Sequence, residues 1–149
     1  MDQGGKEVLR KRSTYDKNYQ SGLDTVKSLV EEFDQYTSSK NTVGICIPGF
    51  SSIETGLVNN ANCVWINDQP FQKDLELILN REIKMMNDAD WFALSEAIDG
   101  SGANDKSVWG IIVGCGFGGS FVYSKEVVEG VKQVAGDWGH QPLPYPTKE

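Results

Sequence analysis

Short apolar runs alternate along this chain with longer stretches of helical periodicity, and this alternation constrains the fold more than any other feature. The runs "TVGICIPG" (42–49) and "VWGIIVGC" (108–115) have the length and the continuous apolar character of buried strands, and "EIKMMN" (82–87) predicts a short strand. Residues 6–15 predict an edge strand with weaker periodicity. Strands that alternate with helices predict an α/β layer structure, with a mixed or parallel sheet and flanking helices.

Helical periodicity marks three stretches. Residues 21–37 carry apolar side chains at three- and four-residue steps, and Ser21 with Asp24 has the spacing of a capping box. A second helix is expected to begin at Pro70, and a third spans residues 88–98. The side chains expected to face inward are Phe71, Leu75 and Ile78 in the second helix and Trp91, Leu94 and Ile98 in the third.

Composition narrows the class of protein further. A chain of 149 residues, 39% hydrophobic and 23% charged, is long enough for one domain with a core. A net charge of -7 argues against a nucleic-acid partner, because such proteins usually present a basic face. Three cysteines without C-x-x-C spacing do not predict a disulfide framework. With no apolar leader and no run of membrane-span length, we expect a cytoplasmic protein without a membrane partner.

Three motifs follow the predicted strands directly. They are Pro48-Gly49, Asn87-Asp88 and the stretch from Gly114 to Gly119. Ligands of α/β sheets gather at the carboxyl ends of strands, so we expect these motifs to form one site.

The Asn87-Asp88 pair has two interpretations. An Asp at a helix start caps the helix and suits its positive end. Alternatively, Asp88 is a general base that accepts a proton from a substrate hydroxyl while that oxygen attacks phosphorus, and Asn87 orients a sugar hydroxyl. Asp90, one turn into the helix, is interpreted as an ordinary first-turn acid.

The glycine-rich stretch "GCGFGG" also allows two interpretations. It is either a turn between strands, where glycine supplies a positive φ, or a cradle whose backbone N–H groups bind phosphate. His140 is the only histidine, and a lone histidine is more often structural than a ligand. Asp137 and His140 nevertheless have a spacing that suits one polyol or one metal ion. A zinc site needs about four ligands, and no cysteine lies near His140, so a metal site within this chain alone is not expected.

The asparagine-rich stretch "NNANCVWINDQPF" adds further candidates. Asn60 and Asn62 are turn formers in the simpler interpretation. In the functional interpretation, Asn62 binds a sugar hydroxyl through its amide, and Trp65 supplies an apolar wall.

The order of these motifs resembles the ROK family of sugar kinases. The resemblance runs from about residue 6 to about residue 144, and the pieces "NANCVWINDQPF" and "DWGHQPLP" are most similar to the bacterial fructokinase/mannokinase branch. The stretches that carry it are "TVGICIPG", "TGLVNNANCVWINDQPF", "MNDADWFALSEA", "IIVGCGFGGSFV" and "AGDWGHQPLP".

The resemblance implies an actin-like ATPase, ribonuclease H-like fold and transfer of phosphate from ATP, with Mg²⁺, to a hexose hydroxyl. Fructose or mannose is the implied acceptor, and Asp88 is the implied general base. The family histidine, here His140, also ligates a structural zinc together with a cysteine cluster. The other implied roles are sugar binding by Asn62, Asn87, Asp137 and His140, and phosphate binding by Gly114, Cys115, Gly116 and Gly118.

Departures from the family pattern qualify this expectation. The family's D-x-G-G-T loop and its cysteine cluster are absent from the sequence, so residues 1–149 are expected to be a partial N-terminal α/β domain, truncated at both ends and inactive alone. Cys115, Asp137 and Asp90 stand where the family has Thr, Glu and Asn. The alternative is a non-catalytic module that binds or senses sugar. The resemblance also allows a homodimer of the full-length protein.

Overall fold

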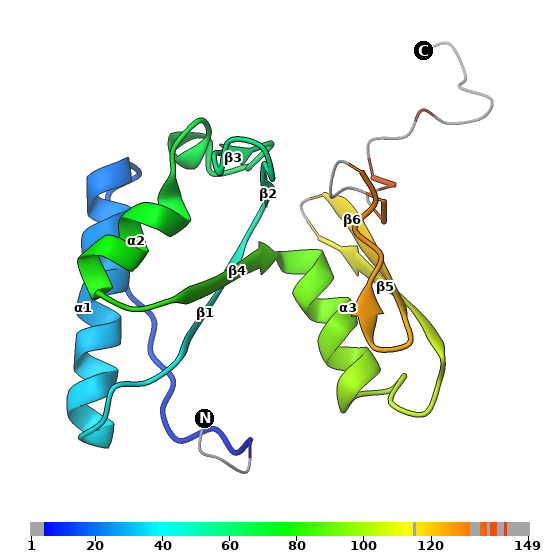
Figure 1. The fold of residues 1–149 in the computed structure, drawn as a ribbon, viewed down its shortest axis with the longest axis horizontal. Helices are drawn as coiled ribbons and strands as arrows, with labels where there is room; N and C mark the ends of the chain where they lie inside the picture. Colours follow the sequence, from blue (N-terminus) through cyan, green and yellow to red (C-terminus); the bar gives the residue numbers. More distant parts are fainter. Residues whose placement is uncertain (1–4, 115, 132–134, 137, 140–141, 143–149) are drawn as a thin grey trace.

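A computed structural model describes residues 5–114, 116–131, 135–136, 138–139 and 142 (Figure 1). The described residues form two hydrophobic cores, one around a parallel strand pair and one around an antiparallel sheet. The elements in chain order are α1 (Tyr19–Thr37), β1 (Val43–Ile47), β2 (Phe50–Ser51), β3 (Val58–Asn59), a 3-10 turn η1 (Val64–Ile66), α2 (Phe71–Leu79), β4 (Ile83–Asn87), α3 (Asp88–Ile98), β5 (Ser107–Val113), β6 (Phe117–Tyr123) and β7 (Glu126–Val127).

The first core packs beneath the parallel pair of β1 and β4. The register runs from Val43 opposite Ile83 to Ile47 opposite Asn87. The pair is parallel because the chain crosses back through α2 between the two strands. Figure 1 shows α1 and α2 together beside this pair. The buried residues of this core are Leu23, Ile47, Val58, Ala61, Ile66, Phe71, Leu75, Leu79 and Ile83.

The second core lies between α3 and the antiparallel sheet β5–β6–β7 (Figure 1). Helix and sheet approach closely, since a Cβ atom placed on Gly110 would lie 2.6 Å from the Cβ of Ala93. The β5 side chains on the face away from α3 are exposed, with Trp109 at 57%, so the expectation of a fully buried strand is wrong here. It is also wrong for β1, where Gly44 and Cys46 are exposed. Helix α3 covers one face of this sheet, and the apolar side chains of alternate β5 residues point to the other.

The predicted α/β class and most elements are confirmed. Within that class the described strands form three small sheets, because β1 and β4 are joined through a helix whereas β5, β6 and β7 are joined by short turns. The expected edge strand at residues 6–15 is wrong. This polar segment forms no strand, and Lys11 makes an exposed ion pair with Glu32 of α1.

Two local predictions about the helices also need correction. The N-cap of α1 is Asn18, whose side chain accepts a hydrogen bond from the Ser21 backbone N–H (2.9 Å), so Ser21 is not the cap. Ile78 and Ile98 are 37% and 55% exposed rather than inward. The residues that α3 buries are Ala89, Ala93 and Ala97, because only small side chains fit where the helix touches the sheet.

In the part of the chain that the structure describes, no helix has both the length and the apolar character needed to cross a membrane.

Candidate functional site

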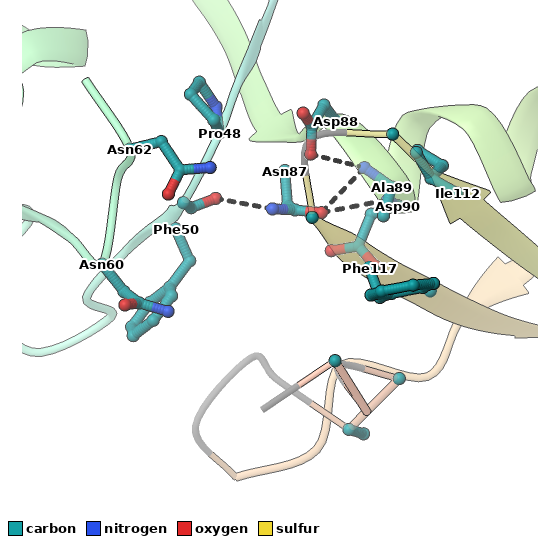
Figure 2. Close-up of a pocket in the computed structure, with 18 of the residues that line it drawn as sticks. Pro48, Phe50, Asn60, Asn62, Asn87, Asp88, Ala89, Asp90, Ile112 and Phe117 are labelled. Atoms are coloured by element: carbon teal, nitrogen blue, oxygen red, sulfur yellow. Dashed lines mark hydrogen bonds between the residues drawn. The ribbon is translucent and has the colours of Figure 1, made fainter. Parts of the chain in front are cut away.

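The carboxyl ends of β1 and β4 lie side by side. Ile47 is in register with Asn87, so the Pro48-Gly49 turn and Asp88 leave the sheet at the same edge. A cavity of about 720 Å³ opens there, and the glycine-rich start of β6 contributes another wall. The prediction that the three motifs meet is therefore confirmed. The described lining residues include Pro48, Gly49, Phe50, Asn60, Asn62, Asn87, Asp88, Asp90, Gly114, Gly116, Phe117, Gly118 and Glu129 (Figure 2).

Asn87 caps α3 and also reaches across to the first strand. Its side-chain oxygen accepts hydrogen bonds from the backbone N–H groups of Ala89 (2.8 Å) and Asp90 (3.3 Å). Its Nδ2 donates to the Gly49 carbonyl oxygen at 3.0 Å (Figure 2). The carbonyl side of the amide is thus fully used, and one amide hydrogen is left for a ligand.

Asp88 is the first residue of α3, and its side chain is exposed. Its Oδ1 accepts from the Ala89 N–H at 2.9 Å. Among the residues that the structure describes, none donates a hydrogen bond to Oδ2. Because Asn87 performs the capping that the simpler interpretation gave to Asp88, this carboxylate is not needed as the cap.

The negative charge of Asp88 acts on a neighbouring thiol. Partial desolvation raises the pKa of the exposed Cys46 thiol in β1, and the charge of Asp88 raises it further. A raised pKa favours the protonated thiol near neutral pH.

Asp90 links the first turn of α3 to the second sheet. The hydroxyl of Ser120, which is only 1% exposed, donates a hydrogen bond to Asp90 Oδ1. Because Ser120 lies in β6, this bond joins the helix that begins at Asp88 to the strand that follows the glycine-rich turn. Asp90 is therefore more than an ordinary exposed first-turn acid.

The glycine-rich stretch combines a turn with a strand. The N–H of Gly114 donates to the Gly116 carbonyl oxygen (2.9 Å), which closes a tight turn, and Gly118 already belongs to β6. A Cβ atom on Gly114 or Gly116 would meet nothing within 4 Å, whereas one on Gly118 would lie 3.8 Å from the Ala89 Cβ. The turn glycines therefore leave open space beside the cavity.

The loop of Asn60 to Asn62 is held by a residue that the sequence reasoning missed. The side chain of Asn67 accepts from the Ala61 N–H (2.8 Å) and donates to the Ala61 carbonyl (3.1 Å). The Asn-Asp pair before Pro70 marked a turn, but its bond to a residue six positions back had no sequence signal.

Trp65 does not provide the expected apolar wall. It packs against the first core, with its ring centroid 5.4 Å from that of Tyr15 and 6.1 Å from that of Phe71. A bulky indole on a turn before an amphipathic helix is drawn into the core, because burial of its apolar area outweighs exposure to a cavity. Phe50 in β2 lines the cavity instead.

Three predicted site residues, Cys115, Asp137 and His140, lie outside the described residues. Within the described ranges, no group of three or more His, Cys, Asp and Glu side chains is arranged to hold a metal ion. The described lining of the cavity carries the carboxylates of Asp88, Asp90 and Glu129 and no cationic side chain.

Known proteins with similar folds and sequences identify the fold class and the family of this chain. The fold is similar to that of a ROK family glucokinase from Streptomyces griseus, solved with glucose and AMPPNP (TM-score 0.80, 21% identity, 93% of this chain and 44% of that one). This is the actin-like ATPase class that the sequence predicted. Residues 1–149 match the sequence profile of the ROK family, and the chain belongs to that family.

Sequence relatives carry a more specific name. The chain is 38% identical over 144 residues to an N-acetyl-D-glucosamine kinase of Pasteurella multocida (strain Pm70), covering 97% of this chain and 47% of the relative. It is 40% identical over 127 residues to that of Vibrio atlanticus (strain LGP32), covering 85% of this chain and 42% of the relative. The chain thus spans less than half the length of the curated relatives it matches.

Proposed function

We propose that this chain contributes the acceptor side of the active site of an ATP-dependent hexose kinase, with Asp88 as the general base. The observation that supports this most directly is that two adjacent residues at the start of α3 have different roles. Asn87 caps the helix, so the exposed carboxylate of Asp88 opens onto the cavity at the carboxyl end of β4. A fixed carboxylate with a free oxygen suits proton abstraction.

In the proposed reaction, a hexose hydroxyl gives its proton to Asp88 while its oxygen attacks the γ-phosphorus of ATP. A new P–O bond forms to the sugar, the bond to the β-phosphate oxygen breaks, and ADP leaves. Positioning and charge stabilisation contribute most of the catalysis in such transfers. Asp88 and the acceptor therefore need to be held within hydrogen-bonding distance.

The remaining roles are proposed by motif. Asn62 binds the acceptor through its amide, and Asn87 can donate its remaining N–H to a hydroxyl oxygen. Asp137 and His140 are proposed as further sugar ligands. The open glycine turn is proposed to bind phosphate through Gly114, Cys115, Gly116 and Gly118.

The negative charge of the cavity lining affects how ATP can bind. The described lining has three carboxylates and no cation, so it cannot by itself neutralise a triphosphate. Mg²⁺ bound with the nucleotide would supply that positive charge. The carboxylates themselves favour an uncharged acceptor over a sugar acid or a sugar phosphate.

The most specific part of the proposal is which sugar accepts the phosphate. The motifs resemble the fructokinase/mannokinase branch, while the relatives described above are named N-acetyl-D-glucosamine kinases. We therefore take N-acetylglucosamine as the first acceptor to test, with fructose and mannose as the competing ones. We propose that the protein acts in the cytoplasm.

We propose that residues 1–149 are part of the N-terminal α/β domain of a longer kinase. The remaining segments would complete the ATP site and the ligand set of a structural zinc at His140, and the full-length protein would form a homodimer. The 149-residue chain alone is proposed to be inactive, since it spans less than half of its relatives.

The test is an ADP-release assay on the complete reading frame that contains this chain, with ATP and Mg²⁺ and each of the three sugars. We expect turnover with at least one sugar. Asp88→Asn should lower kcat by about 10²- to 10⁴-fold while acceptor binding, measured by calorimetry, is retained. Sugar binding without turnover would favour the non-catalytic sugar-binding module. Full activity of Asp88→Asn would exclude Asp88 as the base.

A further inference from the structure

We propose that Asn60 is a specificity-determining residue of the cavity, whose side-chain amide contacts the substituents of the acceptor ring on the wall formed by β2 and β3. This inference rests on the proposed function, and it concerns which sugar is accepted rather than how phosphate is transferred.

Asn60 follows β3 directly and lines the cavity together with Phe50 of β2. The two strands are antiparallel, with Phe50 in register with Asn59, so Asn60 and Phe50 belong to the same wall. Figure 2 shows their side chains on the side of the cavity opposite Phe117. An aromatic face beside an amide suits a sugar, which presents both C–H groups and hydroxyls.

Hydrogen bonding divides the asparagines around this end of the cavity into two groups. The amide of Asn59 donates to the Leu57 carbonyl (3.0 Å), and those of Asn67 and Asn87 also bond to backbone groups. The side chains of Asn60 and Asn62 make no hydrogen bond to any residue that the structure describes. The first group holds the loops in place, and the second presents unused amides to the cavity.

The backbone beneath Asn60 is held from two sides. Asn67 bonds to both the N–H and the carbonyl of Ala61, the next residue. Gly49 packs so closely that a Cβ atom there would lie 2.9 Å from the Ala61 N and Cα atoms. An amide on a fixed backbone loses less entropy on binding than one on a free loop, so it is suited to discriminate between ligands.

A simpler reason for an asparagine at this position is its backbone conformation. Asn60 has φ +54°, and asparagine adopts this left-handed region more readily than most residues. Glycine meets the same requirement without a side chain. Replacement by glycine therefore separates the two explanations, because it preserves the turn and removes only the amide.

The test uses the complete reading frame and three variants. Asn60→Gly removes the amide, and Asn60→Asp removes its N–H donors but keeps an oxygen acceptor. Asn80→Gly is the matched control, because Asn80 also has a positive φ (+49°), ends α2 and lies outside the cavity lining. Values of kcat and KM are measured with N-acetylglucosamine, fructose and mannose, and KM is measured with ATP.

We expect Asn60→Gly to raise KM for the preferred sugar by roughly threefold to tenfold, the effect of one lost hydrogen bond, and to change the ranking or spacing of the three sugars. The values of kcat and of KM for ATP should stay within about twofold. Asn60→Asp should discriminate differently from both the parent and Asn60→Gly, and Asn80→Gly should match the parent.

Two results would overturn the inference, and they are distinguishable. If the parent phosphorylates a sugar and Asn60→Gly has the same KM values and the same sugar preference, Asn60 is only a turn residue while the proposed function stands. If the parent neither binds nor phosphorylates any of the three sugars, the proposed function fails together with the inference.

Discussion

The side-chain Nδ2 of Asn87 donates a hydrogen bond to the carbonyl oxygen of Gly49, 38 residues earlier in the chain, at a distance of 3.0 Å. The oxygen of the same amide caps α3. One side chain therefore joins the turn after β1 to the helix that begins with Asp88, and it fixes the backbone on which the proposed base is carried.

Replacement of Asn87 should separate its two roles. Asn87→Ala loses both the cap and the bridge and should lower the free energy of unfolding by about 1–2 kcal/mol. Asn87→Ser keeps a capping oxygen but is too short to donate to Gly49, so its loss should be smaller. Urea denaturation followed by circular dichroism gives both values. Equal stability of the parent and Asn87→Ala would contradict the structural account.

Gly49 is expected to be difficult to replace, because a side chain there would be both strained and crowded. It has φ +136°, and a Cβ atom there would lie 2.7 Å from the Asn59 carbonyl oxygen. Gly56 is the matched control, because it also has a positive φ (+71°) but nothing lies within 4 Å of a Cβ at that position. Gly56→Ala should cost about 1 kcal/mol from backbone strain.

Gly49→Ala should lose about 1–3 kcal/mol more than Gly56→Ala, because the crowding adds to the strain. Thermal and urea denaturation of the two variants make the comparison directly. If both variants lose the same stability, the close contact between the Gly49 turn and the Asn59–Ala61 backbone is not important for folding.

Gly114→Ala should affect function without affecting stability. Nothing lies within 4 Å of a Cβ atom at Gly114, so the free energy of unfolding should change by less than about 0.5 kcal/mol. If the turn binds phosphate through its backbone, the added methyl group hinders that approach, and KM for ATP should rise roughly tenfold.

Gly110→Ala is the opposite case, because it should lower stability without a direct effect on phosphate binding. Its Cβ atom would lie 2.6 Å from that of Ala93, so overpacking should cost about 1–3 kcal/mol. An unchanged KM for ATP in Gly114→Ala would remove the support for a phosphate-binding turn.

An ion pair between Asp34 and Arg81 should make stability depend on pH. The pKa of Asp34 lies well below its usual range, mainly because Arg81 donates hydrogen bonds to its carboxylate. The backbone N–H of Asn41 is the second cause. A carboxylate whose pKa is lower in the folded than in the unfolded state stabilises the fold above the unfolded pKa of about 3.9. That contribution is lost as the pH falls through the folded pKa.

We therefore expect Asp34→Asn to be about 2 kcal/mol less stable than the parent at pH 7, and the difference to shrink as the pH is lowered from about 5 towards 2. Glu7→Gln is the control, since the Glu7–Arg10 pair is well exposed and should matter little. Urea denaturation at several pH values measures this, and a difference that stays constant with pH would contradict the expectation.

Much of the scaffold was predictable from local patterns. The apolar runs of β1 and β4 and the helix from Asp88 to Ile98 appear where the sequence places them. The meeting of Pro48-Gly49 with Asp88 also followed, because the ends of parallel strands share one edge of a sheet. The family and the fold class followed from the order of the motifs.

The roles of individual side chains were less predictable. Trp65 was expected at the cavity and lies against the core, while Phe50 takes its place. Ile98 was expected inside and is exposed, because α3 approaches Gly110 closely enough that alanines form the contact. Periodicity along one element indicates a face, but it does not indicate how near the next element lies.

The sequence by itself determined most of the elements, their order and the edge of the sheet at which a site forms, because hydrophobic periodicity and strand polarity are local properties. Only the tertiary structure decided which polar side chains find a hydrogen-bond partner within the protein and which remain available to a ligand. The amide of Asn87 finds its partner at Gly49, and Ser120 finds Asp90 thirty residues away. Such partners are chosen by distance in space, and no pattern of neighbouring residues encodes that distance.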